Sequence, residues 1–302
     1  MKGAEMRHFL DADDLQPSEL ARILNLAADP KPPQVLAGKG AALLFEKPSA
    51  RTRSATEMAV VQLGGHPIYI GPAEVGLDQR ETVEDVTRTL AGYTAVIGAR
   101  VFAHSTVERM AAVSSVPIVN LLSDQAHPTQ AVADLLTIRA ELGHLEGLTL
   151  AYVGDANNMA RSLAYAAGLS GMALRIASPE GYGFKESDLR PMRRRGCEPV
   201  QVSKPAEAVS GADVVYTDVW ASMGQEAEAE KRRQDFAGFT VNRALMARAA
   251  PGALFLHCLP AHRGEEVEAR VIDGDRSRVW PQAANRMHAA RGLLLWLMEE
   301  VD

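Results

Sequence analysis

The stretch AALLFEKPSARTRSATEMAVVQLGG, residues 41–65, indicates the fold of this chain. Its first five residues, AALLF (41–45), form an uninterrupted apolar run that is typical of a buried β-strand. Residues 50–65 then follow a helical pattern that ends in two glycines, which commonly close a helix. A strand, a short loop and a helix make up the repeating unit of α/β proteins.

The same unit recurs on both sides of a restart near residue 148. Strand-like runs are followed by helical patterns in each half, and they lie at 41–45, 67–71, 95–102 and 116–122, and then at 148–154, 172–178, 198–202, 214–220 and 253–260. Such alternation predicts parallel sheets with helices on both faces. We therefore expect two doubly wound α/β domains, residues 1–145 and 146–283, with a last helix at 284–300 that packs back on the first. Ligands of such sheets bind beyond the carboxyl ends of the strands, so we expect the active site in the cleft between the two domains.

Bulk composition narrows the class of protein. The 302 residues suit two domains, and 47% apolar with 23% charged residues is an ordinary globular composition. A net charge of −6 argues against a nucleic-acid partner, and no apolar run approaches the ~18 residues of a membrane span. Two distant cysteines and a polar N-terminus without a signal-peptide core point to the cytoplasm.

The helix that follows the first strand begins with an anion-binding pattern. Ser49 occupies the expected N-cap position, and the unpaired N–H groups of a helix N-terminus attract anions. Arg51 and Thr52 add donors that suit phosphate oxygens. Arg53 should point elsewhere, toward Glu57 one turn later. The alternative is a capped helix with solvated arginines.

Other polar residues of the first half also lie at strand ends or helix starts. Arg100 ends a predicted strand, and its alternative role is that of an ion-pair partner. His127 and Gln130 begin the helix at 127–142, where they could hold a carbonyl oxygen and an amide nitrogen. The alternative for His127 is a structural helix cap.

The second half offers a different set of groups. Gly154 is the only glycine of the turn after the strand at 148–154, so the dinucleotide fingerprint G-x-G-x-x-G is missing. Asn157 and Asn158 could cap the next helix or bind an amino-acid carboxylate. Asp218, at a strand end, would suit a substrate ammonium, or else caps a loop. Cys258 also ends a strand, and its alternative is core packing.

Most of these residues belong to six motifs that occur in a fixed order along the chain. They are SARTR (49–53), HPTQ (127–130), GDANNM (154–159), DVWASMG (218–224), HCLPAHRGEE (257–266) and NRMH (285–288). Together they resemble the aspartate/ornithine carbamoyltransferase family over nearly the whole chain. HCLP and DVWASMG look like the ornithine branch, whereas HPTQ is an aspartate-like feature.

The resemblance implies a role for each matching residue. The carbamoyl phosphate-binding residues would be Ser49, Ala50, Arg51, Thr52, Arg100, His127, Gln130, Cys258, Leu259 and Arg286. The ornithine-binding residues would be Asn158, Asp218, Ser222 and Met223. The catalytic residues would be Cys258, Asp218, Arg51 and His127. The two domains would accordingly be a carbamoyl phosphate-binding domain and an ornithine-binding domain.

The implied reaction transfers the carbamoyl group of carbamoyl phosphate to the δ-amine of ornithine, giving citrulline and phosphate. The resemblance implies no cofactor, no metal, no membrane and a homotrimer. Two alternatives stay open: a different acceptor (putrescine, N-acetylornithine or aspartate) and a non-catalytic paralogue. Ala50 departs from the commoner S-T-R-T-R pattern, so we expect weaker phosphate binding. Family members often supply a glutamine to a neighbouring subunit, and Gln79 in the 74–82 loop is close to that position without a certain register.

Overall fold

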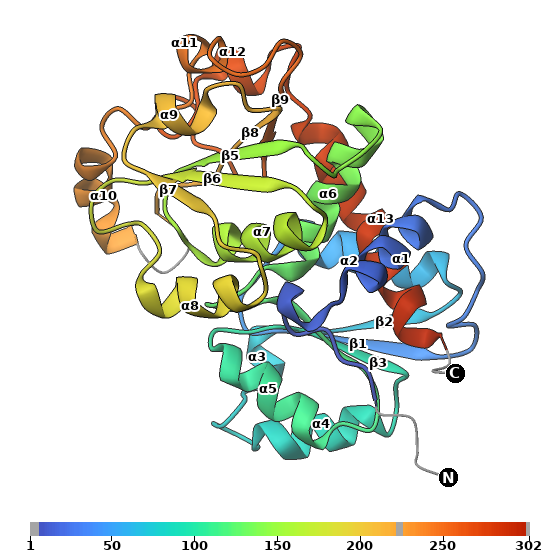
Figure 1. Ribbon diagram of the computed structural model, residues 1–302. Helices are drawn as coiled ribbons and strands as arrows, with labels where there is room; N and C mark the ends of the chain where they lie inside the picture. Colours follow the sequence, from blue (N-terminus) through green and yellow to red (C-terminus); the bar gives the residue numbers. More distant parts are fainter. Residues whose placement is uncertain (1–5, 222–225, 300–302) are drawn as a thin grey trace. The chain divides into compact units, whose positions relative to one another are not determined.

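The computed structural model describes residues 6–221 and 226–299, which belong to two compact units. The first unit comprises Met1–Leu136 and Ala284–Asp302, and the second Thr137–Ala283. Each unit contains one all-parallel sheet with helices against it (Figure 1). Among the described residues, no helix is both long and apolar enough to cross a membrane.

The sheet of the first unit has the strand order β2-β1-β3-β4. Its strands are β1 (Gly40–Phe45), β2 (His66–Ile70), β3 (Val96–Arg100) and β4 (Ile118–Leu122), as the apolar runs predict. From β1 the chain moves to one edge of the sheet and then crosses to the other side, so β1 and β3 flank a topological switch point. The loops that leave these two strands diverge there, which is where ligands of open α/β sheets bind.

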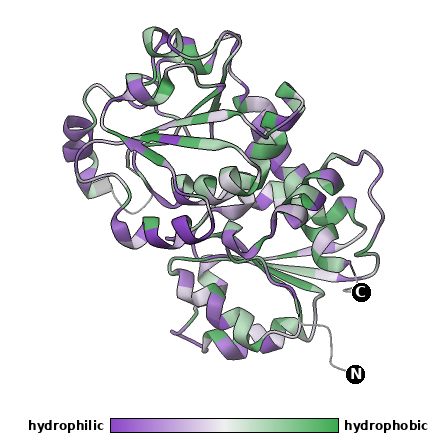
Figure 2. Ribbon diagram, in the orientation of Figure 1, coloured by the Kyte–Doolittle hydropathy of each residue, from purple (hydrophilic) through white to green (hydrophobic). Residues whose placement is uncertain are grey.

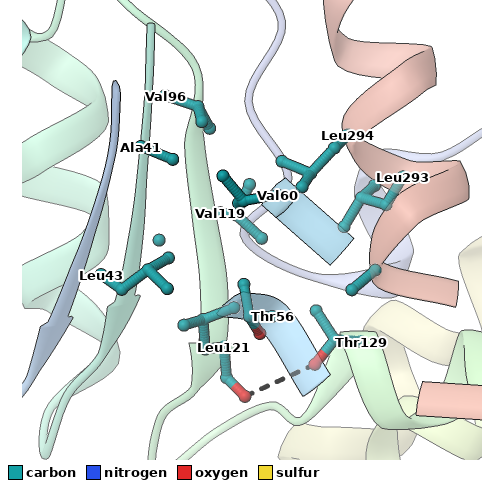
Figure 3. Close-up of a pocket in the computed structure, with 12 residues that line it drawn as sticks. Ala41, Leu43, Thr56, Val60, Val96, Val119, Leu121, Thr129, Leu293 and Leu294 are labelled. Atoms are coloured by element: carbon teal, nitrogen blue, oxygen red, sulfur yellow. Dashed lines mark hydrogen bonds between the residues drawn. The ribbon is translucent and has the colours of Figure 1, made fainter. Parts of the chain in front are cut away.

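Helices cover this sheet on both faces (Figure 1). They are α1 (Pro17–Ala28), α2 (Ala50–Gln62), α3 (Pro72–Val75), α4 (Val83–Ala91) and α5 (His104–Val113), with the parts of α6 (Pro128–Leu142) and α13 (Val279–Met298) that belong to the first unit. Residues 42 and 44 of β1 pack with α4 and α5 in one core cluster. Residues 41 and 43 face α2 and α13 (Figure 3). Successive side chains of a strand point to opposite faces, so β1 is buried on both sides.

The ends of α2 and α13 follow ordinary chain chemistry. Gly64 adopts φ 79°, a left-handed conformation that closes α2 as the Gly-Gly pair predicts. Helix α13 already begins at Val279, earlier than the predicted residue 284. Pro281 lies in its first turn, where the missing N–H removes no helical hydrogen bond.

The sheet of the second unit has the order β7-β6-β5-β8-β9. Its strands are β5 (Thr149–Val153), β6 (Ala173–Ala177), β7 (Val200–Val202), β8 (Val214–Thr217) and β9 (Leu254–His257), each inside a predicted run. The described helices of this unit are α7 (Asn158–Leu169), α8 (Glu186–Arg194), α9 (Pro205–Val209), α10 (Ala229–Asp235), α11 (Arg243–Met246) and α12 (Ala269–Ile272). The strands are mostly apolar, whereas α8 and α10 are hydrophilic (Figure 2). The switch point of this sheet lies between β5 and β8.

Candidate functional site

The N-terminus of α2 forms the first part of the candidate site, at the switch point of the first unit. Ser49 is the N-cap, and its side chain accepts a hydrogen bond from the Thr52 N–H at 3.3 Å. The Thr52 hydroxyl, almost fully buried, accepts a hydrogen bond of 2.6 Å from the guanidinium of Arg286 on α13. The start of α2 is thus already joined to a cation that is distant in sequence. Ala50 begins the helix and is exposed to solvent.

Positive charge accumulates at the same place. Arg100 is the last residue of β3 and is only 6% exposed. Burial lowers the pKa of its guanidinium to about 10, and the nearby charges of Arg286 and Arg51 contribute to that decrease. The Nε atom of Arg100 is buried and has no hydrogen-bond partner among the described residues. Three cations that repel one another and a buried donor suit a multiply charged anion.

His127 and Gln130 lie at the start of α6 and are both buried. Burial holds the pKa of His127 well below its usual range, and the charges of Arg286 and Arg100 lower it further. The imidazole is therefore neutral at pH 7. The Gln130 amide donates to the Asp134 carboxylate at 2.8 Å, which fixes its orientation. Its Oε1 is buried without a hydrogen-bond partner among the described residues, so it can accept one from a ligand.

Asp218 is the centre of the second set, directly after β8 at the switch point of the second unit. Its side chain is buried, and its Oδ1 accepts hydrogen bonds from the Val219 N–H at 2.8 Å and from Cys258 Sγ at 3.0 Å. Its Oδ2 accepts from the Asn157 amide at 3.1 Å. A carboxylate offers about four acceptor positions. Among the described residues three are used, so one position on Oδ2 is left for a ligand donor.

The two asparagines after β5 have different surroundings. Asn157 is the N-cap of α7, and its Oδ1 accepts from the N–H groups of Met159 and Ala160. Its amide nitrogen holds Asp218, so one side chain joins the helix cap to the candidate site. Asn158 is the first residue of α7 and is half-buried. The sequence alone indicated the cap, but it gave no signal for the contact between Asn157 and Asp218.

The loop that carries Cys258 and Leu259 depends on His257, which sequence reasoning missed. Leu259 has φ 61°, a left-handed conformation that is unusual for a branched side chain. Its N–H donates to Nδ1 of the buried His257 at 2.9 Å, so the ring proton lies on Nε2, which donates to Glu266 at 3.1 Å. Gln282 accepts the His257 backbone N–H at 2.9 Å. The signal in the sequence was a histidine and a glutamate inside the HCLPAHRGEE motif.

Two predicted ligand residues cannot be placed, and one arginine lies away from the set. Ser222 and Met223 fall outside the described residues. Arg53 pairs with Glu57 at 2.8 Å, as predicted, and its guanidinium also lies 3.6 Å from the ring centroid of Tyr69.

An apolar cavity of about 10 Å³ lies between the first sheet and its helices (Figure 3). A volume of that size holds about one water molecule at most, so this cavity is a packing defect and not a substrate site.

Three side chains of the second unit have the spacing of metal ligands. Donor atoms of Asp218, His257 and Cys258 lie within 4.8 Å of one another. Both ring nitrogens of His257 are already engaged in hydrogen bonds. A metal ion would therefore have to displace Glu266 or the Leu259 N–H, so the arrangement does not favour one.

The two switch points define a class of protein. One presents guanidinium groups and a helix N-terminus to an anion, and the other presents a buried carboxylate to a cation. An α/β enzyme that transfers a group from a phosphorylated donor to an amine needs both. Two family models match the chain: the carbamoyl-P binding domain of aspartate/ornithine carbamoyltransferase over residues 7–140, and the Asp/Orn binding domain over residues 146–297. The chain belongs to the aspartate/ornithine carbamoyltransferase family, and it is a carbamoyltransferase.

Individual proteins that are similar to this chain in sequence or in structure belong to the same family. The chain is 48% identical over 297 residues to an ornithine carbamoyltransferase of Thermus thermophilus, with 97% of each chain covered. It is 46% identical over 303 residues to one of Anoxybacillus flavithermus, covering 97% of this chain and 96% of the relative. The solved structure of the ornithine carbamoyltransferase of Pyrococcus furiosus superposes with a TM-score of 0.92 at 43% identity, over 98% of both chains.

Proposed function

We propose that this chain transfers the carbamoyl group of carbamoyl phosphate to the δ-amine of L-ornithine, giving L-citrulline and phosphate. The observation that carries the proposal is the buried Asp218 carboxylate, which Cys258 and Asn157 hold at the switch point of the second sheet. A carboxylate with one acceptor position left suits an amino group of a diamino acid. The relatives described above, which share nearly the full length of the chain, support the same acceptor.

In this proposal the first unit binds the phosphate. Arg51, Arg100 and Arg286 neutralise its charge, and the backbone N–H groups of α2 with Ser49 and Thr52 bind its oxygens. Binding relieves the repulsion among the three guanidinium groups, which adds to the effect of burial in lowering the pKa of Arg100. The same cations stabilise the negative charge that grows on the phosphate as it leaves.

His127 and Gln130 would bind the carbamoyl group. A neutral imidazole donates one hydrogen bond, which suits the carbamoyl oxygen as negative charge develops there. Gln130 Oε1 is oriented as an acceptor by the bond to Asp134, so it suits the carbamoyl NH₂ group. The two side chains thereby distinguish the oxygen of the carbamoyl group from its nitrogen.

The second unit would bind ornithine. Asp218 Oδ2 accepts one N–H of the substrate, and Cys258 lies against the same carboxylate. Asn158, Ser222 and Met223 are assigned to ornithine by the resemblance to the family, which assigns Leu259 to carbamoyl phosphate. No covalent intermediate is needed, because the amine itself is the nucleophile.

The nucleophile must be the neutral δ-amine, whereas an alkylamine has a pKa of about 10.4. At pH 7.5 selection of the neutral form costs about 4 kcal/mol. We therefore expect kcat/KM for ornithine to rise by up to about tenfold per pH unit between pH 6 and 9. Initial rates across that range measure it. A flat profile would exclude amine deprotonation from the rate.

The function is tested by a citrulline colour assay with carbamoyl phosphate and one acceptor at a time. Ornithine should give a coloured ureido product, while putrescine, N-acetylornithine and aspartate should react at least about 100-fold more slowly, since each lacks a group that the site binds or carries a different one. Turnover with another acceptor would change the substrate, and no turnover with any acceptor would favour a non-catalytic paralogue.

We further propose a cytoplasmic homotrimer that acts in arginine metabolism. Family resemblance supports the assembly, and so do exposed apolar side chains on α2 and on the edge strand β2 of the first unit. Met58 and Val61 on α2 and Ile68 on the edge strand β2 are 46%, 48% and 38% exposed. Sedimentation equilibrium would separate a trimer from a monomer.

A further inference from the structure

A buried arginine of the second unit connects the two loops that leave its switch point. Arg232, on α10, is only 7% exposed. Its Nη1 donates to the Asp155 carboxylate at 2.7 Å and to the Trp220 carbonyl at 2.8 Å. Asp155 lies in the loop after β5, and Trp220 in the loop after β8. One guanidinium group therefore spans both loops.

Each of these loops carries candidate acceptor ligands. The Asp155 carbonyl accepts the Asn157 N–H at 2.7 Å, and Asn157 in turn holds Asp218. Trp220 follows Asp218 by two residues. The network from Arg232 to Asp218 therefore closes through both loops. Of these residues, only Asp218 is among the ligands that the family resemblance implies. Asn157 was predicted as a helix cap or a ligand of an amino-acid carboxylate.

The surroundings of Arg232 hold it in place. Its Nε donates to Glu228 at 3.2 Å, and its guanidinium lies 5.1 Å from the ring centroid of Tyr182. The Tyr182 ring packs edge-on against Phe236, and Phe236 stacks on Trp220. The cation thus lies against an aromatic cluster that includes Trp220, a residue of the loop after β8.

Electrostatics give the pair a second effect. Burial raises the pKa of the Asp155 carboxyl, and the nearby Asp218 carboxylate raises it further, against the hydrogen bond from Arg232. The hydrogen bond and the charge of Arg232 oppose that rise, so the arginine favours the charged form of Asp155, in which the carboxylate accepts its hydrogen bond.

We propose that Arg232 and Asp155 are a positioning pair that sets the two loops of the second unit around the amino-acid acceptor. The inference rests on the proposed function, because the acceptor is ornithine. Both residues belong to the second unit, whereas most of the carbamoyl phosphate ligands that the resemblance implies belong to the first. Loss of the pair should therefore weaken acceptor binding selectively.

The test compares Asp155→Asn, Arg232→Met and Arg232→Lys with the wild-type enzyme. Loss of a charge-assisted hydrogen bond should raise KM for ornithine about 10- to 100-fold in the first two variants. Arg232→Lys keeps the charge and should restore part of that loss. KM for carbamoyl phosphate should stay within about twofold of the wild-type value, since the first unit is untouched. Arg233→Met is the matched control, because this arginine of the same helix is exposed and pairs with Glu230 and Glu265, outside the network.

Thermal unfolding identifies any variant that fails to fold; Asp155→Asn, which keeps the size of the side chain, then carries the test. A parallel rise of both KM values, or an unchanged KM for ornithine in a folded variant, would overturn the proposal. Titration calorimetry with L-norvaline, which is ornithine without the δ-amino group, measures acceptor binding directly, with inorganic phosphate present. This measurement tests the pair even if the wild-type chain makes no citrulline. Absence of citrulline formation would refute the proposed function, whereas equal norvaline affinity in wild type and Asp155→Asn would refute the positioning pair.

Discussion

The two sheets carry their polar side chains at equivalent topological positions, but they differ in how far those groups are satisfied within the protein. In the first unit, Arg100 Nε and Gln130 Oε1 are buried and lack hydrogen-bond partners among the described residues. In the second, both oxygens of Asp218 accept hydrogen bonds from Val219, Cys258 and Asn157. The first set has mutually repelling cations, and the second has a carboxylate that is already held.

The difference indicates two ways of recognising a ligand. The cationic set is electrostatically unfavourable until an anion arrives, so much of its affinity comes from charge. The acidic set is oriented beforehand, so its contribution is geometric and loses little entropy on binding. Substitutions in the two units should therefore act on different substrates.

The largest effect is expected for Asp218→Ala. This change removes the buried carboxylate that the half-buried donors of Cys258 and Asn157 hold, and truncation of one partner of a buried, hydrogen-bonded charge costs about 2–5 kcal/mol. The expected loss in kcat/KM for ornithine is about 30-fold or more. Steady-state kinetics measure it, and KM for carbamoyl phosphate should change much less than KM for ornithine, since only Cys258 and Leu259 of the second unit are assigned to that substrate. Equal damage to both substrates would remove the contrast between the units.

Arg51→Ala should act on the other substrate. Loss of one charge-assisted phosphate contact costs about 1.5–3 kcal/mol, which is about a 10- to 150-fold loss in kcat/KM for carbamoyl phosphate. Arg53→Ala is the control on the same helix, since Arg53 pairs with Glu57 and packs on Tyr69. If both variants lost activity equally, general positive charge and not a specific contact would explain the result.

Ala50→Thr should strengthen the first set. It places a hydroxyl at the exposed first residue of α2, beside the unpaired N–H groups of the helix. One added hydrogen bond is worth about 0.5–1.5 kcal/mol, so KM for carbamoyl phosphate should fall about 2- to 10-fold. An unchanged KM would show that the hydroxyl of the commoner motif is not needed here.

The smallest effect concerns stability and pH. The pKa of His127 lies well below its ordinary value of 6.5 in the folded chain, so the unfolded chain binds more protons as pH falls below 6.5. Stability should therefore decrease on acidification, by at most about 1.4 kcal/mol per pH unit from this group. Urea unfolding at pH 7 and pH 5.5 measures this effect. The free energy of unfolding should decrease less for His127→Gln than for the wild type. His8 and His288 also have lowered pKa values, so the comparison between variant and wild type isolates His127. An equal decrease in both proteins would contradict a neutral buried His127.

Local sequence patterns predicted the strands, the main helices and the strand ends at which polar residues gather. Period and length suffice for a buried strand such as β1, because it is apolar on both faces. The start of α13 was predicted too late, since Val279 and Trp280 gave no N-cap signal before Pro281.

Long-range contacts could not be predicted from local patterns. The hydrogen bond between Arg286 and Thr52 joins residues that are 234 positions apart. The support of Leu259 by His257 and Glu266, and the span of Arg232 across two loops, depend on how loops fold against a completed sheet. Periodicity reports which face a residue occupies, and it carries no information on which side chain it meets.

The double engagement of Asn157 limits how this region can change over evolution. Aspartate, serine and threonine are comparable helix caps, so helix stability alone would permit several residues at this position. Only asparagine adds an N–H donor on the same short side chain, and aspartate would set a second negative charge against Asp218. The stability of α7 and the charge balance around the acceptor thus cannot change independently during evolution. A substitution of Asn157 that keeps the helix cap still removes the amide donor to Asp218.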